Sequence, residues 1–169
     1  MLGSLQDVGN TTTLANYLET LRESKLLAGL QKYSVDKSRK YRSIPKLQVF
    51  NNALLTATSD AVSFSKVLSD TTKWGRWVES SVGSYLLDVA DRLESQLYYW
   101  RENNEEVDFV LTRGEKTLAI EVKSGRNMTN TGMSVFIQKF HPTHSLVVGT
   151  RPGAMPIEQL YTGDLSTLL

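Results

Sequence analysis

The chain has 169 residues, of which 40% are hydrophobic and 22% charged, a composition typical of globular proteins that excludes intrinsic disorder. It contains no cysteine, which excludes disulfides and cysteine-ligated zinc and leads us to expect a cytoplasmic protein. The formal net charge is only +1, and no apolar run approaches the roughly 18 residues that span a membrane. We therefore expect no membrane insertion, and any binding of nucleic acid has to depend on local clusters of charge.

Residues 1–50 predict a helix followed by two strands. Residues 11–24, TTTLANYLETLRES, carry apolar side chains at helical spacing, namely Leu14, Tyr17, Leu18 and Leu21. Residues 25–34 and 41–50 read as two strands joined by a polar turn. Because a helix and a hairpin in this order outline the end of a winged helix, we assign residues 1–50 to a partial winged-helix segment that resembles a DNA-binding one.

The hairpin of this segment is the most basic part of the chain. A single acid, Asp36, stands among six basic residues: Lys32, Lys37, Arg39, Lys40, Arg42 and Lys46. One interpretation is a solvated loop whose charge keeps the protein in solution. The other is a wing that lies on DNA phosphates, with Lys37, Arg39, Lys40 and Arg42 as the nucleic-acid-binding residues. The residues alone leave both interpretations open.

Residues 51–169 predict a second unit built of helices and strands. Residues 51–67 have a mixed pattern and mark the boundary. A long amphipathic helix begins near Thr72, with an apolar side made of Trp77, Val78, Val82, Tyr85, Leu86, Val89 and Leu93. We expect strands at residues 96–101, 107–112, 117–123 and 145–150, with a helix at residues 133–140 before the last of them. This order predicts an α/β fold of the α+β type.

The strands at residues 107–112 and 117–123 predict a hairpin with a defined register. If residues 113–116 form its turn, Asp108 faces Glu121 and Glu106 faces Lys123. Because side chains alternate along a strand, all four project from one face of the sheet. The opposite face is then apolar and faces the core, with Val107, Phe109, Leu111, Leu118, Ile120 and Val122 on it.

Two carboxylates on facing strand positions, Asp108 and Glu121, repel each other unless a cation lies between them. Facing side chains are only about 5 Å apart at Cβ. Lys123 is one candidate for the cation, and a hard divalent ion is another, because carboxylates are the ligands that Mg²⁺ prefers. The competing interpretation is an ordinary strand face in which the charges point apart into water.

The helix with Trp77, Val78 and Glu79, followed by YYWR, EVDFVL and AIEVKSG, resembles the PD-(D/E)XK nuclease-like superfamily. More narrowly, the chain is similar to the C-terminal restriction-endonuclease-like module of prokaryotic AAA-type ATPases, in which the module follows a winged helix. The resemblance covers roughly residues 2–150. It implies a restriction-endonuclease-like mixed sheet flanked by helices over residues 51–169.

Carried over to this sequence, the resemblance implies four site residues. Asp108 matches the acid of the second core strand, and Glu121 and Lys123 match the E-x-K of the third. Glu79 matches a glutamate of the first core helix. Asp108, Glu121 and Lys123 are thus the expected catalytic residues, and Glu79, Asp108 and Glu121 the expected ligands of Mg²⁺ or Mn²⁺.

The function implied by the resemblance is that of a nuclease-like domain that binds DNA and hydrolyses phosphodiester bonds with Mg²⁺. The alternative is a catalytically silent DNA-binding or protein-interaction module that regulates its ATPase. Since the sequence holds no G-x-x-x-x-G-K-[ST] motif, the ATPase core is not part of it. We expect a C-terminal fragment of an AAA-type ATPase, with DNA and the missing ATPase domain as partners; a free-standing remnant is the other possibility.

Overall fold

The computed structural model of the chain describes residues 11–35, 43–58, 63–124 and 131–169. Within them the helices and strands follow one another as α1 (Thr11–Glu23), β1 (Leu27–Lys32), β2 (Lys46–Val49), α3 (Ala53–Thr58), α4 (Phe64–Ser69), α5 (Thr71–Arg92), β3 (Gln96–Glu102), β4 (Glu105–Arg113), β5 (Lys116–Lys123), α6 (Thr131–Phe140), β6 (His144–Gly149), α7 (Ile157–Thr162) and a final 3₁₀ turn, Leu165–Leu168. The described part of the chain contains no helix that is long and apolar enough to cross a membrane.

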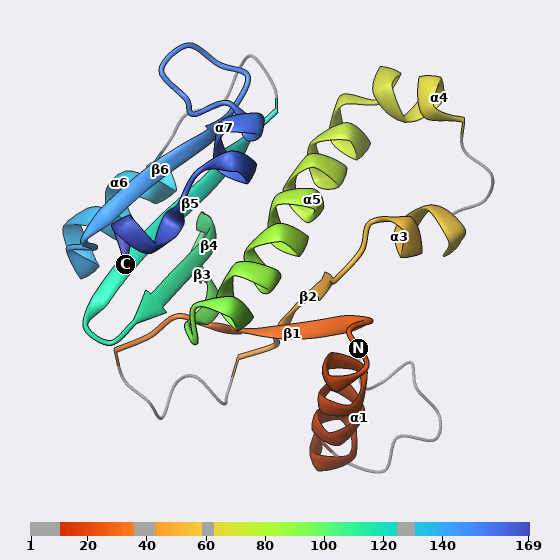
Figure 1. Ribbon diagram of the computed structural model, residues 1–169, viewed down its shortest axis with the longest axis horizontal. Coiled ribbons are helices and arrows are strands. Elements are labelled where there is room, and N and C mark those ends of the chain that lie inside the picture. Colours follow the sequence, from red (N-terminus) through yellow and green to blue (C-terminus); the bar gives the residue numbers. More distant parts are fainter. Residues whose placement is uncertain (1–10, 36–42, 59–62, 125–130) are drawn as a thin grey trace.

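The strands form one six-stranded mixed sheet in the order β2-β1-β3-β4-β5-β6 (Figure 1). The pairs β1–β2, β3–β4 and β4–β5 are antiparallel, whereas β1 pairs parallel with β3 and β5 pairs parallel with β6. Helices flank this sheet, so the predicted α+β class with a mixed sheet is confirmed. Strands β1 and β2, from the segment interpreted as part of a winged helix, lie in the same sheet as the later strands; the division at residue 50 stays a prediction.

Helices α5 and α6 cover opposite faces of the sheet, and each closes an apolar cluster (Figure 1). On the α5 side, Val82 and Leu86 of the helix pack with Phe109 of β4. On the α6 side, Phe136 packs with Trp100 of β3, whose ring centroid lies 5.4 Å away. Fully burying an aromatic or leucine side chain contributes about 1.5–3 kcal/mol, so these two clusters hold the helices on the sheet. The central strands are therefore buried on both faces.

The β4–β5 hairpin has the register that the sequence predicts over all of its paired residues. Cα partners run from Arg113 and Lys116 at the turn to Phe109 and Ile120. Gly114 has φ of +58°, a conformation that tight hairpin turns require and that glycine adopts without strain. This part of the prediction is confirmed.

An irregularity beside Asp108 overturns the prediction that four charged residues share a face. Between the β3–β4 pairs Tyr98–Val110 and Trp100–Val107, strand β4 advances three residues while β3 advances two. The extra residue is a β-bulge, which shifts the side-chain alternation. Val107 consequently packs in the α6-side cluster although Phe109 packs in the α5-side cluster. The placement of Val107 on the face of Phe109 was wrong, because sequence alternation assumes an unbroken ladder.

Candidate functional site

Strand β2 is fixed to helix α5 by a buried amide. Gln48 is 3% exposed, and its Nε2 donates to the carbonyl oxygens of Val49 and Ser80, each at 2.9 Å. Gly83 of α5 makes room for this amide, since a Cβ at position 83 would lie 2.2 Å from Gln48 Oε1. Lys46 is two residues before Gln48, so both side chains project from the same face of β2. The anchor at Gln48 therefore directs Lys46 toward α5.

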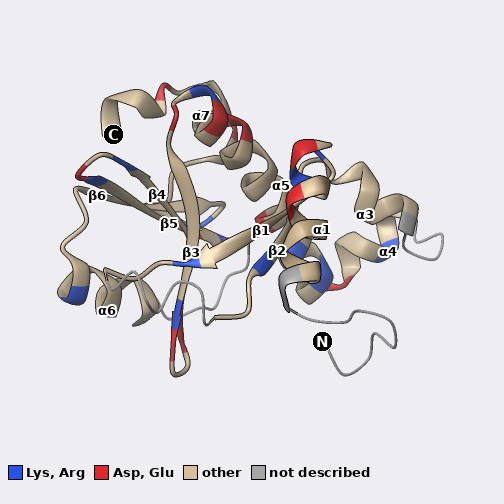
Figure 2. Ribbon diagram, turned by 90° about the horizontal axis from the view of Figure 1, so that it is seen from below, with Lys and Arg blue, Asp and Glu red and all other residues tan. Residues whose placement is uncertain are grey.

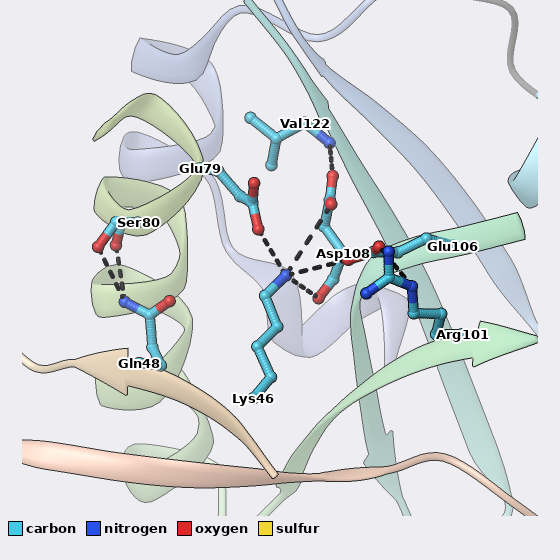
Figure 3. A network of polar contacts seen from close by, with 8 residues as sticks. All are labelled: Lys46, Gln48, Glu79, Ser80, Arg101, Glu106, Asp108 and Val122. Atoms are coloured by element: carbon cyan, nitrogen blue, oxygen red, sulfur yellow. Dashed lines mark hydrogen bonds and ion pairs between the residues drawn. The ribbon is translucent and has the colours of Figure 1, made fainter. Parts of the chain in front are cut away.

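The ammonium group of Lys46 lies among three carboxylates (Figure 3). Its Nζ is 2.5 Å from Glu79 Oε1, 3.7 Å from Glu106 Oε1 and 4.0 Å from Asp108 Oδ1. It also donates to the backbone oxygen of Asp108 at 3.4 Å and lies 4.9 Å from the centre of the Phe109 ring. The side chain of Lys46 is 20% exposed. One lysine thus provides the positive charge for acids from a helix and a strand.

The β-bulge of β4 turns Asp108 toward the α5 side of the sheet, where Glu79 and Lys46 lie. Its Oδ2 accepts a hydrogen bond from the backbone N–H of Val122 at 2.8 Å, so the carboxylate also lies against β5. Burial and the nearby charge of Glu79 raise the pKa of Asp108 to about 7, although Lys46 and the N–H of Val122 oppose the shift. Burial beside another carboxylate thus favours the protonated form of Asp108.

The acids keep Lys46 charged in spite of its burial. Burial by itself lowers the pKa of a lysine, but Glu79, Asp108 and Glu106 favour the ammonium form and raise the pKa of Lys46 above 10.5. Arg101 supplies a second positive charge, with Nε 3.4 Å from Glu106 Oε2. The cluster therefore holds three carboxyl groups, one internal ammonium and one guanidinium whose side chain is 66% exposed.

Glu121 and Lys123 of β5 form an ion pair with each other. They are 4% and 8% exposed. Strand alternation places both on the face that carries Ala119, which packs in the α6-side cluster. The ammonium of Lys123 thus neutralises Glu121, while the ammonium of Lys46 pairs with the acids on the α5 side of the sheet.

The expected metal ligands fit a divalent cation poorly in this arrangement. Mg²⁺ binds carboxylate oxygens at about 2.0–2.1 Å in an octahedral shell. Across the residues that the structure describes, no three carboxylate or histidine side chains are grouped so that they could hold a metal ion. The ammonium of Lys46 already lies among Glu79, Glu106 and Asp108. Glu121 is already paired with the ammonium of Lys123.

Of the predicted site residues, the structure brings Glu79 and Asp108 together and pairs Glu121 with Lys123. Lys37, Arg39, Lys40 and Arg42, the predicted nucleic-acid-binding residues, lie outside the described residues. Sequence reasoning missed the roles of Lys46, Gln48 and Glu106. The segment PKLQVF does alternate polar and apolar residues, which indicates a strand with one polar face, but it does not say what that face contacts.

Comparison with families of known proteins gives a match. A family described as "Domain of unknown function (DUF4143)" matches residues 74–165, more than half of the chain. The chain belongs to this family. DUF4143 is a domain found in AAA-ATPase-associated proteins, in agreement with the coarser part of the predicted resemblance. No curated protein and no solved structure matches the chain.

The DUF4143 match assigns the acids and the lysine of the cluster to different parts of the chain. Glu79, Glu106 and Asp108 lie within the matched residues, as does the Glu121–Lys123 pair. Lys46 precedes the matched residues. The positive charge at the centre of the cluster is thus contributed to the DUF4143 domain by the strand before it.

Proposed function

We propose that this chain is a nuclease-like module of an AAA-type ATPase that binds DNA but does not hydrolyse it. The observation that carries the proposal is the ammonium of Lys46, which lies within 4.0 Å of the carboxylates of Glu79, Glu106 and Asp108. A nuclease of this kind needs those acids for a metal that activates water and neutralises the scissile phosphate. With an internal lysine among the acids, the module lacks the metal chemistry that hydrolysis needs. DNA binding does not depend on that chemistry.

DNA as the partner is supported by the resemblance to nuclease-like modules and by the basic run at residues 32–46. Elsewhere in the described chain, Figure 2 shows basic and acidic residues interspersed along the ribbon. The contribution to DNA binding is therefore assigned to Lys37, Arg39, Lys40 and Arg42. The binding constant of a protein for duplex DNA falls with salt, and each phosphate contact makes the slope of its logarithm against log salt steeper by about 0.9.

The first experiment is a cleavage assay on plasmid and linear DNA with Mg²⁺ or Mn²⁺. Wild type and Asp108→Ala are expected to leave both substrates intact, since the proposed module does not cut. Cleavage by wild type that disappears in Asp108→Ala would contradict the proposal.

The second experiment measures DNA affinity over a range of salt concentrations. Changing Lys37, Arg39, Lys40 and Arg42 together to alanine is expected to weaken binding and to reduce the salt slope by about 3–4. A matched control changes four exposed basic residues elsewhere: Lys73, Arg113, Lys116 and Arg151. Equal losses in the two variants, or none in the first, would refute the assignment of DNA binding to the wing.

Metal-dependent hydrolysis of DNA is the second candidate function, and one observation favours it. Glu79, Glu106 and Asp108 come from two separate elements yet approach a single cationic atom. This function requires Lys46 to leave the cluster. The cleavage assay above decides between the two candidates.

A further inference from the structure

One residue of strand β3, Tyr99, contacts the chain on both sides of the basic residues to which DNA binding is assigned. These basic residues are called the wing residues: Lys37, Arg39, Lys40 and Arg42. We infer that Tyr99 is a positioning residue of the wing, which ties both ends of the segment carrying the wing residues to the sheet and so presents them to DNA. The inference deepens the proposed function and rests on it, because it concerns how the same DNA-binding residues are held.

Tyr99 makes these two contacts through different groups. Its backbone carbonyl accepts a hydrogen bond from the N–H of Tyr33 at 2.7 Å, which continues the pairing of β1 with β3 beyond the end of β1. Its phenol hydroxyl donates a hydrogen bond to the backbone oxygen of Ile44 at 2.7 Å. Residues 34–43 lie between the two contacts and include all four wing residues. The chain is thus fixed to one strand residue before and after the wing residues.

The side chain of Tyr99 is itself held in place and keeps its proton. It packs against the apolar cluster on the α5 side of the sheet. Burial, and then the nearby charge of Glu106, raise the pKa of Tyr99 above 10, so the hydroxyl remains a donor near neutral pH. Tyr99 lies within the residues that match DUF4143, whereas the wing residues precede them. The DUF4143 domain therefore supplies the group that fixes the far end of the wing segment.

Fixing both ends of the wing segment should favour DNA binding through conformational entropy. A segment with close, fixed ends has fewer conformations than one with a free end, so less freedom is lost when its side chains bind phosphates. Without the hydroxyl of Tyr99, the segment would next be fixed at β2, which begins at Lys46. A single neutral hydrogen bond typically changes an equilibrium constant about 2- to 10-fold. The expected effect on DNA affinity is of that size.

The test is the affinity of Tyr99→Phe for duplex DNA over a range of salt concentrations. This variant keeps the ring and loses the hydroxyl, and it should bind about 2- to 10-fold more weakly than wild type. Its salt slope should equal that of wild type, because the four basic side chains still reach the phosphates. The matched control is Tyr161→Phe, which loses a hydroxyl hydrogen-bonded to Ser81 Oγ at 2.8 Å; it should bind as wild type does.

A double-mutant cycle separates positioning from a direct contact with DNA. In the variant whose four wing residues are changed to alanine, adding Tyr99→Phe should cause no further loss of affinity. A direct contact of Tyr99 with DNA, or general damage to the fold, would lower the affinity in both backgrounds.

Four outcomes would overturn the inference. They are wild-type affinity in Tyr99→Phe, an equal loss in Tyr161→Phe, a loss that persists when the wing residues are alanine, and failure of Tyr99→Phe to fold. Wild type that binds no DNA would refute the proposed function and this inference with it. Wild type that binds through the wing residues but is unaffected by Tyr99→Phe would refute this inference alone.

Discussion

Replacing Asp108 by asparagine should change how the stability of the protein depends on pH. The asparagine keeps an oxygen for the N–H of Val122, which Asp108 Oδ2 accepts at 2.8 Å in the wild type. It removes the one ionisable group of the cluster whose pKa is moved to about 7, chiefly by burial and by Glu79. The substitution therefore isolates the cost of ionising a carboxylate in this place.

The sign and size of the effect follow from the two pKa values of Asp108. A carboxyl group with a pKa of 3.8 in the unfolded chain and about 7 in the folded protein binds its proton more tightly when folded. Its contribution to stability is complete below pH 3.8 and is lost as the pH rises through 7. Between about pH 5 and pH 8 this loss amounts to about 2–3 kcal/mol. Lys46 does not titrate in this window, because its pKa is raised above 10.5.

Urea denaturation at both pH values measures the effect. Asp108→Asn should gain about 2–3 kcal/mol relative to wild type when the pH is raised from about 5 to about 8. Asp88→Asn is the matched control, since the Asp88 side chain lies on α5 and is 69% exposed; it should show no comparable gain. If Asp108→Asn and wild type lose stability in parallel over this range, the reasoning about a buried, repelled carboxylate is refuted.

Three substitutions test the packing around the cluster by urea denaturation. Gly83→Ala should cost about 1–3 kcal/mol, because the new Cβ would lie 2.2 Å from Gln48 Oε1 and 2.8 Å from Phe109 Cζ; an unchanged midpoint would contradict the tight contact. Gly132→Ala should cost at least as much, since its Cβ would lie 2.1 Å from the backbone oxygen of Glu106, and a neutral result would mean that α6 does not dock there. Glu121→Gln should lower the free energy of unfolding by about 3 kcal/mol, because it leaves Lys123 buried without its partner. The double variant with Lys123→Met should lose less stability than the two single variants together, and a loss equal to their sum would argue against the ion pair.

The elements of the fold could be predicted because their sequence patterns are local. The long amphipathic helix α5 and strands β3 to β6 all lie close to the expected positions. The register of the β4–β5 hairpin followed from its short turn and its apolar alternation. The pairing of β1 with β3 could not be predicted, because it joins residues about 67 positions apart that carry no complementary signal.

The candidate site could be predicted only in part. Glu79 and Asp108 do approach each other, as the resemblance implied, and the charge of Glu121 also helps to raise the pKa of Asp108. The bulge beside Asp108, however, breaks the strict alternation that the prediction assumed. From the sequence, Lys46 was assigned only as one of several basic residues of a predicted hairpin. Its place among carboxylates depends on the packing of β2 against α5, which is a tertiary contact.

The central claim is that Lys46 supplies the cation of the acidic cluster. Counting bound Mn²⁺ by electron paramagnetic resonance tests it most directly, in wild type and in Asp108→Ala at the same protein concentration. The account predicts no bound Mn²⁺ in either protein. One bound ion per wild-type chain, lost in Asp108→Ala, would contradict it.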